Sequence, residues 1–233
     1  MSPAHGSAHG RFVRRENRFV VWAARDDGEQ VRAYLPNTGG LDDLLLPDAP
    51  VVLERADRPG RTTAWTLTRV WDGTWVALDA TAPPGLLARH LETGASLGTW
   101  PPTEAVRREV AYGRRRFDLE LDLADGRTAV VEVKSLTSAV DAVAPLSSTP
   151  SARGAAQLEA LGRLAATGTL AAVALVVQRA DVEAVDLAAP AAASWVTSMR
   201  AARAAGVLIA AFACEVGVRE QRLGPPLAVG DRA

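Results

Sequence analysis

Three charged residues in the second half of the chain have the types and spacing that phosphodiester hydrolysis requires. Asp118 falls in one predicted strand, and Glu132 and Lys134 stand two positions apart in the next, so both project from the same face of that strand. Two carboxylates can hold a hard cation such as Mg²⁺ or Mn²⁺, and an ammonium group can orient water or steady developing negative charge. The spacing predicts a divalent-metal site at Asp118 and Glu132, with Lys134 assisting catalysis.

Two strands must meet for these side chains to converge. The sequence predicts strands over Arg116–Leu123 and Arg127–Val133, joined by a hairpin turn at Asp125 and Gly126. Valines make the second strand a buried one, where a glutamate and a lysine are costly unless they are paired or bound to metal. Spacing alone also allows a surface strand with an ordinary cross-strand salt bridge between an aspartate and the lysine.

Lys134 is unusual in this composition. Of the 26 basic residues, 25 are arginine and only this one is lysine. Arginine spreads its charge over a planar fork, whereas a lysine ammonium is a compact charge whose pKa responds to its surroundings. The exception points to a position where arginine would not serve.

Further candidates lie near these residues in the sequence. Glu109 is a possible third metal carboxylate, although an exposed acid beside two arginines fits the pattern equally well. Arg116, two positions before Asp118, is placed to contact the scissile phosphate. Gln157, in the helix that follows, either faces the site or faces solvent.

Two arginine clusters are candidate nucleic-acid surfaces, because arginine binds phosphates and bases stack on interleaved aromatic rings. The first comprises Arg11, Arg14, Arg15 and Arg18 with Phe12 and Phe19, and the second comprises Arg107, Arg108, Arg114, Arg115 and Arg116. A solvated charged face is the ordinary alternative for such a run.

The two halves of the chain differ in their secondary-structure pattern. Short strands with turn residues between them predict a small N-terminal β-barrel of the oligonucleotide-binding (OB) type. The predicted strands are Arg18–Ala24, Glu29–Leu35, Val51–Arg55, Ala64–Trp71 and Thr74–Leu78, followed by a helix from Pro83 to about Glu92. The second half alternates helices over Ser151–Thr167 and Ala189–Ala205 with strands over Ala171–Gln178 and Val207–Cys214. This order predicts an α/β domain with a mixed sheet.

Bulk properties restrict the class of protein. The net charge of −1 gives no global basic field, so any nucleic-acid surface must be a local patch. A single cysteine, Cys214, excludes an internal disulfide and fits a reducing compartment. The longest apolar run, Leu170–Val177, is too short to span a bilayer, and residues 1–10 lack the apolar core of a signal peptide. We expect a cytoplasmic protein with no membrane role.

Five motifs carry a resemblance to a known family. They are R-F-V-R-R-E-N-R-F from Arg11, P-N-T-G at Pro36–Gly39, R-R-E-V-A-Y-G at Arg107–Gly113, R-F-D at Arg116–Asp118 and V-E-V-K-S at Val131–Ser135. With these motifs in this order, the chain resembles the sugar fermentation stimulation protein A (SfsA) family of bacterial and archaeal DNA-binding proteins from Arg11 to Val229.

The resemblance implies an OB-like nucleic-acid-binding domain over residues 11–97, after a disordered tail at 1–10, and a PD-(D/E)XK nuclease-like domain over 98–233. It places Asp118, Glu132 and Lys134 on the nuclease signature. It also implies that the turn containing Asn37 and Thr38 lies where the domains or the DNA meet.

The chain departs from the family pattern at three places. P-L-S-S-T-P at Pro145–Pro150 replaces a Phe-Pro-Asp-Ala stretch, and Asp79-Ala80-Thr81 replaces an asparagine-threonine segment. Gln157 stands where the family has histidine, whereas Arg153 matches. These changes leave the metal triad intact and alter residues expected to contact the substrate.

The sequence is compatible with three functions. The first is a DNA-binding protein that cleaves DNA, or RNA, with Mg²⁺ or Mn²⁺. The second is a non-catalytic DNA-binding regulator of sugar metabolism that keeps the nuclease fold as a scaffold. The third is an interaction module with no nucleic-acid role. The sequence leaves the strand preference and the oligomeric state open.

Overall fold

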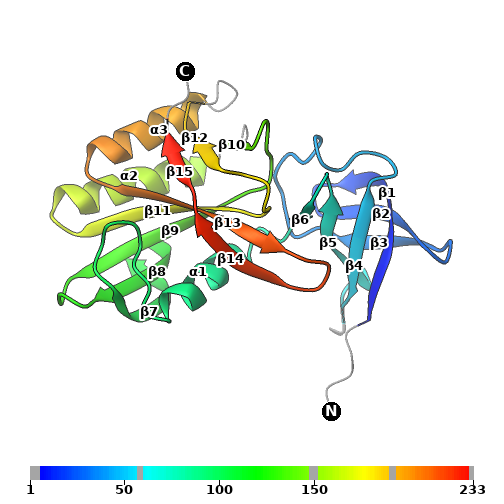
Figure 1. The fold of residues 1–233 in the computed structure, drawn as a ribbon, viewed down its shortest axis with the longest axis horizontal. Helices are drawn as coiled ribbons and strands as arrows, with labels where there is room; N and C mark the ends of the chain where they lie inside the picture. The colour runs from blue at the N-terminus through cyan, green and yellow to red at the C-terminus, as the bar shows by residue number, and fades with distance from the viewer. Residues whose placement is uncertain (1–5, 57–59, 147–151, 189–192, 231–233) are drawn as a thin grey trace, which may run out of the picture.

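The computed structural model describes residues 6–56, 60–146, 152–188 and 193–230. They form a β-barrel and an α/β domain that lie side by side along the longest axis of the molecule (Figure 1). The prediction of a small N-terminal barrel followed by an α/β domain with a mixed sheet is confirmed.

Short strands, with side chains alternating between the interior and solvent, build the barrel. They are β1 (Ser7–Asn17), β2 (Val20–Arg25), β3 (Gln30–Tyr34), β4 (Pro50–Arg55), β5 (Trp65–Trp71) and β6 (Trp75–Ala77). Antiparallel pairing joins them in the order β3-β2-β1-β4-β5-β6, and a parallel pairing of β3 with β5 closes the barrel. Buried aliphatic side chains such as Val21, Leu53 and Leu67 fill the interior.

The strand β1 is absent from the strands that the sequence predicts. Residues 1–10 are predicted as a disordered tail, but β1 begins at Ser7 and its first residues pair with β4. Gly10 permits the close approach of β2, because a Cβ there would lie 2.3 Å from the Ala24 carbonyl oxygen. Two irregularities in the β1–β2 register obscure the alternation of β1 in the sequence. The strand predicted over Arg18–Ala24 corresponds to β2, which begins at Val20.

A six-stranded mixed sheet forms the centre of the second domain, in the order β14-β13-β11-β9-β8-β7. Its strands are β7 (Thr103–Tyr112), β8 (Arg115–Leu123), β9 (Thr128–Leu136), β11 (Leu170–Val177), β13 (Leu208–Val216) and β14 (Gln221–Pro226). The central strands β9, β11 and β13 are parallel, and the outer strands are antiparallel to their neighbours. A separate parallel sheet contains β10 (Val143–Pro145), β12 (Ala184–Asp186) and β15 (Ala228–Gly230). Like β1, the strands β7 and β14 and those of the small sheet are absent from the strands predicted from the sequence.

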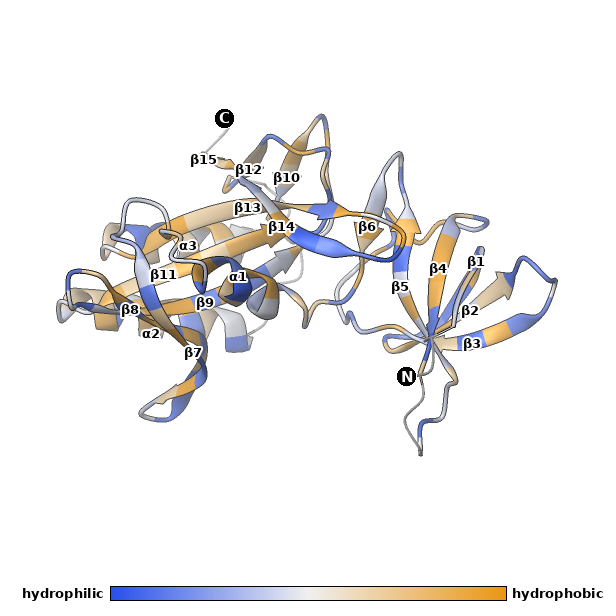
Figure 2. Ribbon diagram, turned by 60° about the horizontal axis from the view of Figure 1, so that its bottom comes forward, coloured by the Kyte–Doolittle hydropathy of each residue, from blue (hydrophilic) through white to orange (hydrophobic). Residues whose placement is uncertain are grey.

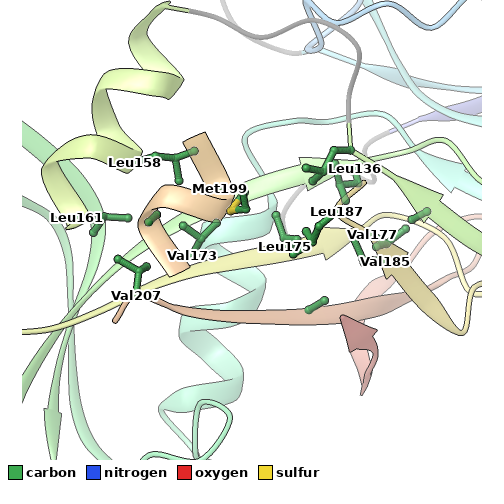
Figure 3. Packing of buried hydrophobic residues seen from close by; sticks show 14 of the residues in the cluster. Leu136, Leu158, Leu161, Val173, Leu175, Val177, Val185, Leu187, Met199 and Val207 are labelled. Carbon is green, nitrogen blue, oxygen red and sulfur yellow. The ribbon is translucent and has the colours of Figure 1, made fainter. Parts of the chain in front are cut away.

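Helices cover both faces of the large sheet. On one face, α2 (Ala152–Ala166) and α3 (Ala193–Ala204) bury side chains such as Leu158 and Met199 against Val173 (Figure 3). The strand β11 between the layers is hydrophobic along its length (Figure 2), as expected for a strand covered on both faces. The described helices agree with those predicted, apart from residues 151 and 189–192, which lie outside the described part of the chain. None of the described helices is long and apolar enough to cross a membrane.

The helix α1 (Pro83–Leu91) covers the opposite face and belongs to the second domain. The predicted domain boundary near residues 97–98 assigns this helix to the barrel. Its buried Leu87 and Leu91 pack instead with Leu119 of β8, so the junction between the domains precedes the helix. The glycine and prolines after residue 97 mark only the connection from α1 to β7.

Candidate functional site

Asp118 lies where strands β8 and β9 stop pairing through their backbones. Their antiparallel ladder ends at the pair Leu119 and Val131. Asp118 precedes Leu119 in β8, and its side chain replaces the next backbone contact with β9. Its Oδ2 accepts a hydrogen bond from the Val133 backbone N–H at 2.7 Å. The hydrogen bond fixes the carboxylate against β9, beside the side chains of Glu132 and Lys134.

Glu132 and Lys134 project from the same face of β9, as their spacing predicts. The Lys134 Nζ lies 2.6 Å from Glu132 Oε1 and donates a hydrogen bond to it. Glu132 is only 3% exposed, and its second oxygen, Oε2, is buried with no hydrogen-bond partner in the structure. A buried carboxylate oxygen without a donor is unfavourable, so Glu132 is incompletely satisfied by the protein alone.

Helices α2 and α3 hold the Lys134 ammonium from the other side. Gln157 of α2 is buried, and its Oε1 accepts a second hydrogen bond from Lys134 Nζ at 3.0 Å. Trp195 of α3 presents its ring to the same ammonium, with 5.9 Å between Nζ and the ring centroid. Of the two orientations that the sequence allows for Gln157, the structure has the one that faces the site. Trp195 is absent from the candidates that the sequence suggests, because it lies 61 positions after the lysine that it contacts.

Burial dominates the electrostatics of the two carboxyl groups. It raises the pKa of Asp118, an effect opposed by the Val133 hydrogen bond and the positive charge of Lys134. Burial also raises the pKa of Glu132, against the attraction of Lys134 and with the repulsion of Asp118. Both pKa shifts mean that one nearby ammonium does not fully compensate the negative charge that burial makes unfavourable.

These two carboxylates fit a divalent cation. Carboxylate oxygens are the ligands that Mg²⁺ and Mn²⁺ prefer, and Glu132 Oε2 is a buried oxygen that no protein donor meets. A cation there would relieve the two unfavourable features of the site, the unpartnered oxygen and the buried negative charge. Asp118 and Glu132 are therefore the residues that could hold a metal.

Glu109 does not complete a three-carboxylate set. Within the described residues, no group of three or more His, Cys, Asp or Glu side chains is arranged to hold a metal ion. Glu109 instead pairs with Arg116 on the exposed surface at 2.9 Å, where its side chain is 73% exposed. Its backbone explains the orientation in part, because φ at Glu109 is +52° in the middle of β7, a conformation that interrupts the alternation of the strand.

A cleft of about 750 Å³ contains the triad and receives residues from both domains. Thr38 and Thr81 line it from the barrel side and the domain junction. Its cationic side chains are those of Arg108, Arg116, Lys134 and Arg153, among which the arginines are exposed. Several N–H donors therefore face the same space as the buried carboxylates, an arrangement suited to an anionic ligand that also meets a metal.

The first arginine cluster lies away from this cleft. Arg11 donates to the Asp48 carbonyl at 3.0 Å, Arg14 lies over the Trp22 ring, and Arg18 lies over its neighbour Phe19. None of these arginines is among the described residues that line the cleft. All three arginines are exposed on the barrel, and those at positions 14 and 18 are each backed by an aromatic ring.

Arg15 is structural, although the sequence groups it with the nucleic-acid-binding arginines. Its guanidinium donates to the carbonyls of Asn17, Arg18, Asn37 and Gly39 at 3.1 to 3.3 Å. These contacts use four of the five N–H donors of the side chain. Arg15 therefore holds the P-N-T-G turn in place and has little capacity left for phosphate.

The P-N-T-G turn lies at the domain junction, as the family resemblance implies. The Pro36 carbonyl accepts a hydrogen bond from the Ala80 N–H at 3.0 Å, and Asn37 Oδ1 accepts one from the Gly39 N–H at 2.9 Å. Thr38 reaches the cleft, whereas Asn37 is buried and lines a neighbouring cavity. The turn thus forms part of the wall between the barrel and the α/β domain.

Comparisons with known proteins agree with this architecture. The family model of the SfsA N-terminal OB domain matches residues 13–78, which identifies the barrel as an OB domain. The family model of the sugar fermentation stimulation protein RE domain matches residues 82–220, so it includes α1. The solved structure of Pyrococcus furiosus SfsA in complex with Ca²⁺ is similar in fold, with a TM-score of 0.81, 24% identity, and coverage of 99% of this chain and 97% of that one.

Two curated relatives are similar over most of their length, and both are described as sugar fermentation stimulation protein homologs. The Chloroflexus aurantiacus protein is 36% identical over 220 residues, covering 94% of this chain and 83% of the relative. The Moorella thermoacetica protein is 37% identical over 209 residues, covering 88% of each chain. The chain therefore belongs to the sugar fermentation stimulation protein (SfsA) family.

Proposed function

We propose that this chain binds DNA and hydrolyses phosphodiester bonds of DNA or RNA with Mg²⁺ or Mn²⁺ held by Asp118 and Glu132, assisted by Lys134. One observation carries the proposal: the buried, unpartnered Oε2 of Glu132 lies in a cleft with a second carboxylate, an ammonium and three arginines. The Pyrococcus furiosus relative is described as a complex with Ca²⁺, which supports a divalent cation for this chain as well. We assign the activity to the cytoplasm, where a lone buried thiol such as Cys214 stays reduced.

A bound divalent cation supplies Lewis acidity toward a phosphoryl oxygen and lowers the pKa of a bound water. The protein groups supply orientation and charge. The Val133 N–H holds Asp118 in place, and Glu132 and Gln157 hold the Lys134 ammonium. In this proposal the scissile phosphate lies next to that ammonium. A fixed ammonium stabilises negative charge that develops on the phosphate oxygens without reorganising during the reaction.

Arginines outside the triad bind the rest of the nucleic acid in this proposal. Arg116 and Arg153 present N–H donors to non-bridging phosphate oxygens within the cleft. Arg14 and Arg18, each backed by an aromatic ring, provide a sequence-independent surface on the barrel. Cleavage, located in the cleft, is therefore separate from additional binding on the barrel.

A cleavage assay tests the function directly. Purified protein is incubated with single-stranded DNA, duplex DNA and RNA, each with Mg²⁺, with Mn²⁺ and with a chelator. We expect metal-dependent cleavage by the wild type and none by Asp118→Ala. Asp122→Ala is the matched control, because Asp122 also lies on β8 but pairs with Arg107 on the surface. Absence of cleavage of all three substrates with either metal would contradict the nuclease proposal.

The non-catalytic regulator remains a second candidate, and one observation favours it. Glu109, the only other carboxylate in the described lining of the cleft, pairs with Arg116 instead of joining the metal carboxylates. A regulator that keeps the nuclease fold needs no third acid. Salt-dependent DNA binding that is identical in the wild type and in Asp118→Ala, without cleavage under either metal, would support this candidate.

A further inference from the structure

A second cavity adjoins the proposed catalytic cleft. It has a volume of about 410 Å³ and lies between the loop after β3 in the barrel and the segment after β9 in the α/β domain. Ala80 and Ser135 line both this cavity and the cleft, so the two spaces are neighbours along one interdomain groove. Ser135 directly follows Lys134, which places the second cavity one residue from the triad. We call it the flanking cavity.

The flanking cavity and the cleft have opposite electrostatic character. Four cationic side chains line the cleft. None of the described residues that line the flanking cavity is positively charged, and two of them, Asp42 and Asp43, are negatively charged. The rest of its lining is largely aliphatic or hydroxyl-bearing, with Leu41, Leu136 and Ser138 as examples. A phosphate is therefore attracted to the cleft and repelled from the flanking cavity.

The flanking cavity is suited to a neutral, largely apolar group that also carries hydrogen-bond donors. Aspartate carboxylates and hydroxyl oxygens accept hydrogen bonds from the amino and imino groups of a ligand. Aliphatic side chains can contact a planar ring of the same ligand. Val140 lies at this cavity with 65% of its surface exposed, which leaves an apolar side chain available for contact. The volume falls in the range of about 300 to 1,000 Å³ that is typical of small-molecule sites, and it accommodates one nucleoside but not a duplex.

We propose that the flanking cavity receives one unpaired base next to the scissile phosphate, so that the substrate is a strand with an unpaired nucleotide at the cleavage position. This inference rests on the proposed function and specifies its substrate class. The phosphate of that nucleotide lies among the cations of the cleft, and the base lies between the loop after β3 on the barrel and the segment after β9 on the α/β domain. A fully paired duplex must first open at this nucleotide, which requires unstacking and unpairing.

Hydrogen bonds within the protein hold part of each described wall of the flanking cavity. Arg15 holds the Asn37 and Gly39 carbonyls of one wall. On the other wall, the Ser135 Oγ accepts a hydrogen bond from Gln178 Nε2 at 2.9 Å, and Gln178 is fully buried. A preformed cavity lowers the entropy cost of ordering protein groups when a ligand binds. Contacts with a base then contribute to affinity, and an abasic nucleotide lacks them.

Abasic scanning tests the inference. In a short single-stranded DNA that holds one protein molecule, each nucleotide is replaced in turn by a tetrahydrofuran abasic residue. Cleavage rates are measured with Mn²⁺, and dissociation constants are measured with Ca²⁺. We expect a loss of roughly tenfold or more in rate or affinity at one position and small effects at the others. Equal behaviour at every position would overturn the inference.

Two filling variants connect that position to the cavity. We expect the indole of Ser138→Trp and that of Val140→Trp to occupy the flanking cavity, because both residues line it and neither is among the described residues that line the cleft. We expect both variants to bind the normal strand as weakly as the wild type binds the strand with the abasic residue. Their affinities for the normal and the abasic strand should then be equal. Ser198→Trp is the matched control, because Ser198 is also a half-buried serine but lies on α3. Circular dichroism verifies that each variant is folded, and a folded filling variant that retains full abasic sensitivity would overturn the assignment.

These measurements separate this inference from the nuclease proposal. If the wild type binds strands with abasic sensitivity that the filling variants abolish, but cleaves nothing, the base site stands and the nuclease proposal fails. If the wild type cleaves with no preference for any base position, the nuclease proposal stands and the base site fails. If it neither binds nor cleaves, both fail.

Discussion

Arg179 and Asp72, which lie 107 positions apart in the sequence, form an ion pair across the domain junction, with Arg179 Nη1 2.8 Å from Asp72 Oδ2. Asp72 is in the turn between β5 and β6 of the barrel, and Arg179 follows β11 of the α/β domain. The guanidinium is 3% exposed and also pairs with Asp181 at 2.6 and 2.7 Å. A neighbouring backbone hydrogen bond, from the Ala77 N–H to the Gln178 carbonyl at 2.9 Å, joins the same two elements. These contacts fix the barrel relative to the triad.

Replacing Arg179 with methionine should destabilise the junction. The change keeps much of the side-chain volume but leaves Asp72 and Asp181 without their shared partner. We expect a loss of about 2 to 3 kcal/mol, at the lower end for a broken buried pair because both carboxylates are partly exposed. Urea unfolding measures the loss, with Arg222→Met as the control, since Arg222 forms only an exposed pair with Glu215. Equal unfolding curves for the two variants would contradict a structural role for Arg179.

The same pair predicts a pH dependence. Arg179 lowers the pKa of Asp181 through their hydrogen bonds, so the folded-state pKa lies below the unfolded one. The stabilisation is therefore complete above the unfolded pKa of about 3.9 and is lost as pH falls through the folded pKa. Wild type should lose more stability than Arg179→Met between about pH 5 and pH 2. Thermal melts across this range check the prediction, and parallel curves would exclude the pair as the cause.

Lys134 should be required for cleavage but not for binding. Lys134→Ala should lower the cleavage rate by about 10² to 10³, the usual effect of removing one group that stabilises developing charge. Lys134→Arg should not restore the rate, because a planar fork does not reproduce a compact ammonium held between Glu132 and Gln157. Single-turnover cleavage and DNA titration distinguish the two effects. Full activity of the arginine variant would show that a positive charge of any shape suffices.

Metal should reverse the order of stability between wild type and Asp118→Asn. Burial raises the pKa of Asp118, so in the metal-free protein its contribution to stability declines as pH rises through the folded-state pKa. The asparagine can still accept the Val133 hydrogen bond without carrying a charge. We therefore expect metal-free Asp118→Asn to melt above wild type at neutral pH. Mn²⁺ at about 100 times its dissociation constant should stabilise wild type by about 2.7 kcal/mol.

Calorimetric titration with Mn²⁺ completes this comparison. Binding to wild type and its absence in Asp118→Asn would agree with the proposed ligand, whereas equal binding would place the ion elsewhere. Because the titration requires no substrate, it reports on the metal site even if cleavage is absent.

Arg14 and Arg15 are adjacent in the sequence but should behave differently when replaced by alanine. Arg15→Ala removes a guanidinium that holds four carbonyls around the P-N-T-G turn, and we expect a loss of about 1.5 to 3 kcal/mol. Arg14→Ala removes an exposed side chain over Trp22 and should change stability by less than about 0.5 kcal/mol. DNA affinity should fall for Arg14→Ala. Equal stability of the two variants would contradict the structural role of Arg15.

The sequence predicts local features of this molecule better than distant ones. The period-two spacing of Glu132 and Lys134 and the glycine turn before them are enough to place both side chains on one face of a hairpin. The burial of Gln157 and the position of Trp195 depend on how α2 and α3 pack on the sheet, which no local pattern encodes. The ion pair between Arg179 and Asp72 cannot be predicted from the sequence, because it depends on how the two domains pack.

Strands are not predicted where polar residues or an irregular register disrupt the alternation of apolar and polar side chains. Much of β7 is exposed and charged, and Glu109 in its middle has a positive φ. Its sequence therefore lacks the alternation by which a strand is predicted. Beyond the last backbone pair of β8 and β9, the Asp118 carboxylate accepts the hydrogen bond that joins the two strands. The prediction of a hairpin does not indicate this side-chain contact. The positive φ of Glu109, which explains part of its orientation, is likewise not encoded in a local sequence pattern.

At the outer side of the six-stranded sheet, no described strand pairs with β7 beyond β8. An unpaired strand offers its amides and carbonyls as a template on which another polypeptide can extend the sheet. Along β7, however, the exposed side chains include those of Glu104, Arg107, Arg108 and Glu109. An incoming strand would have to desolvate these charges, so the sheet resists growth into aggregates at this edge.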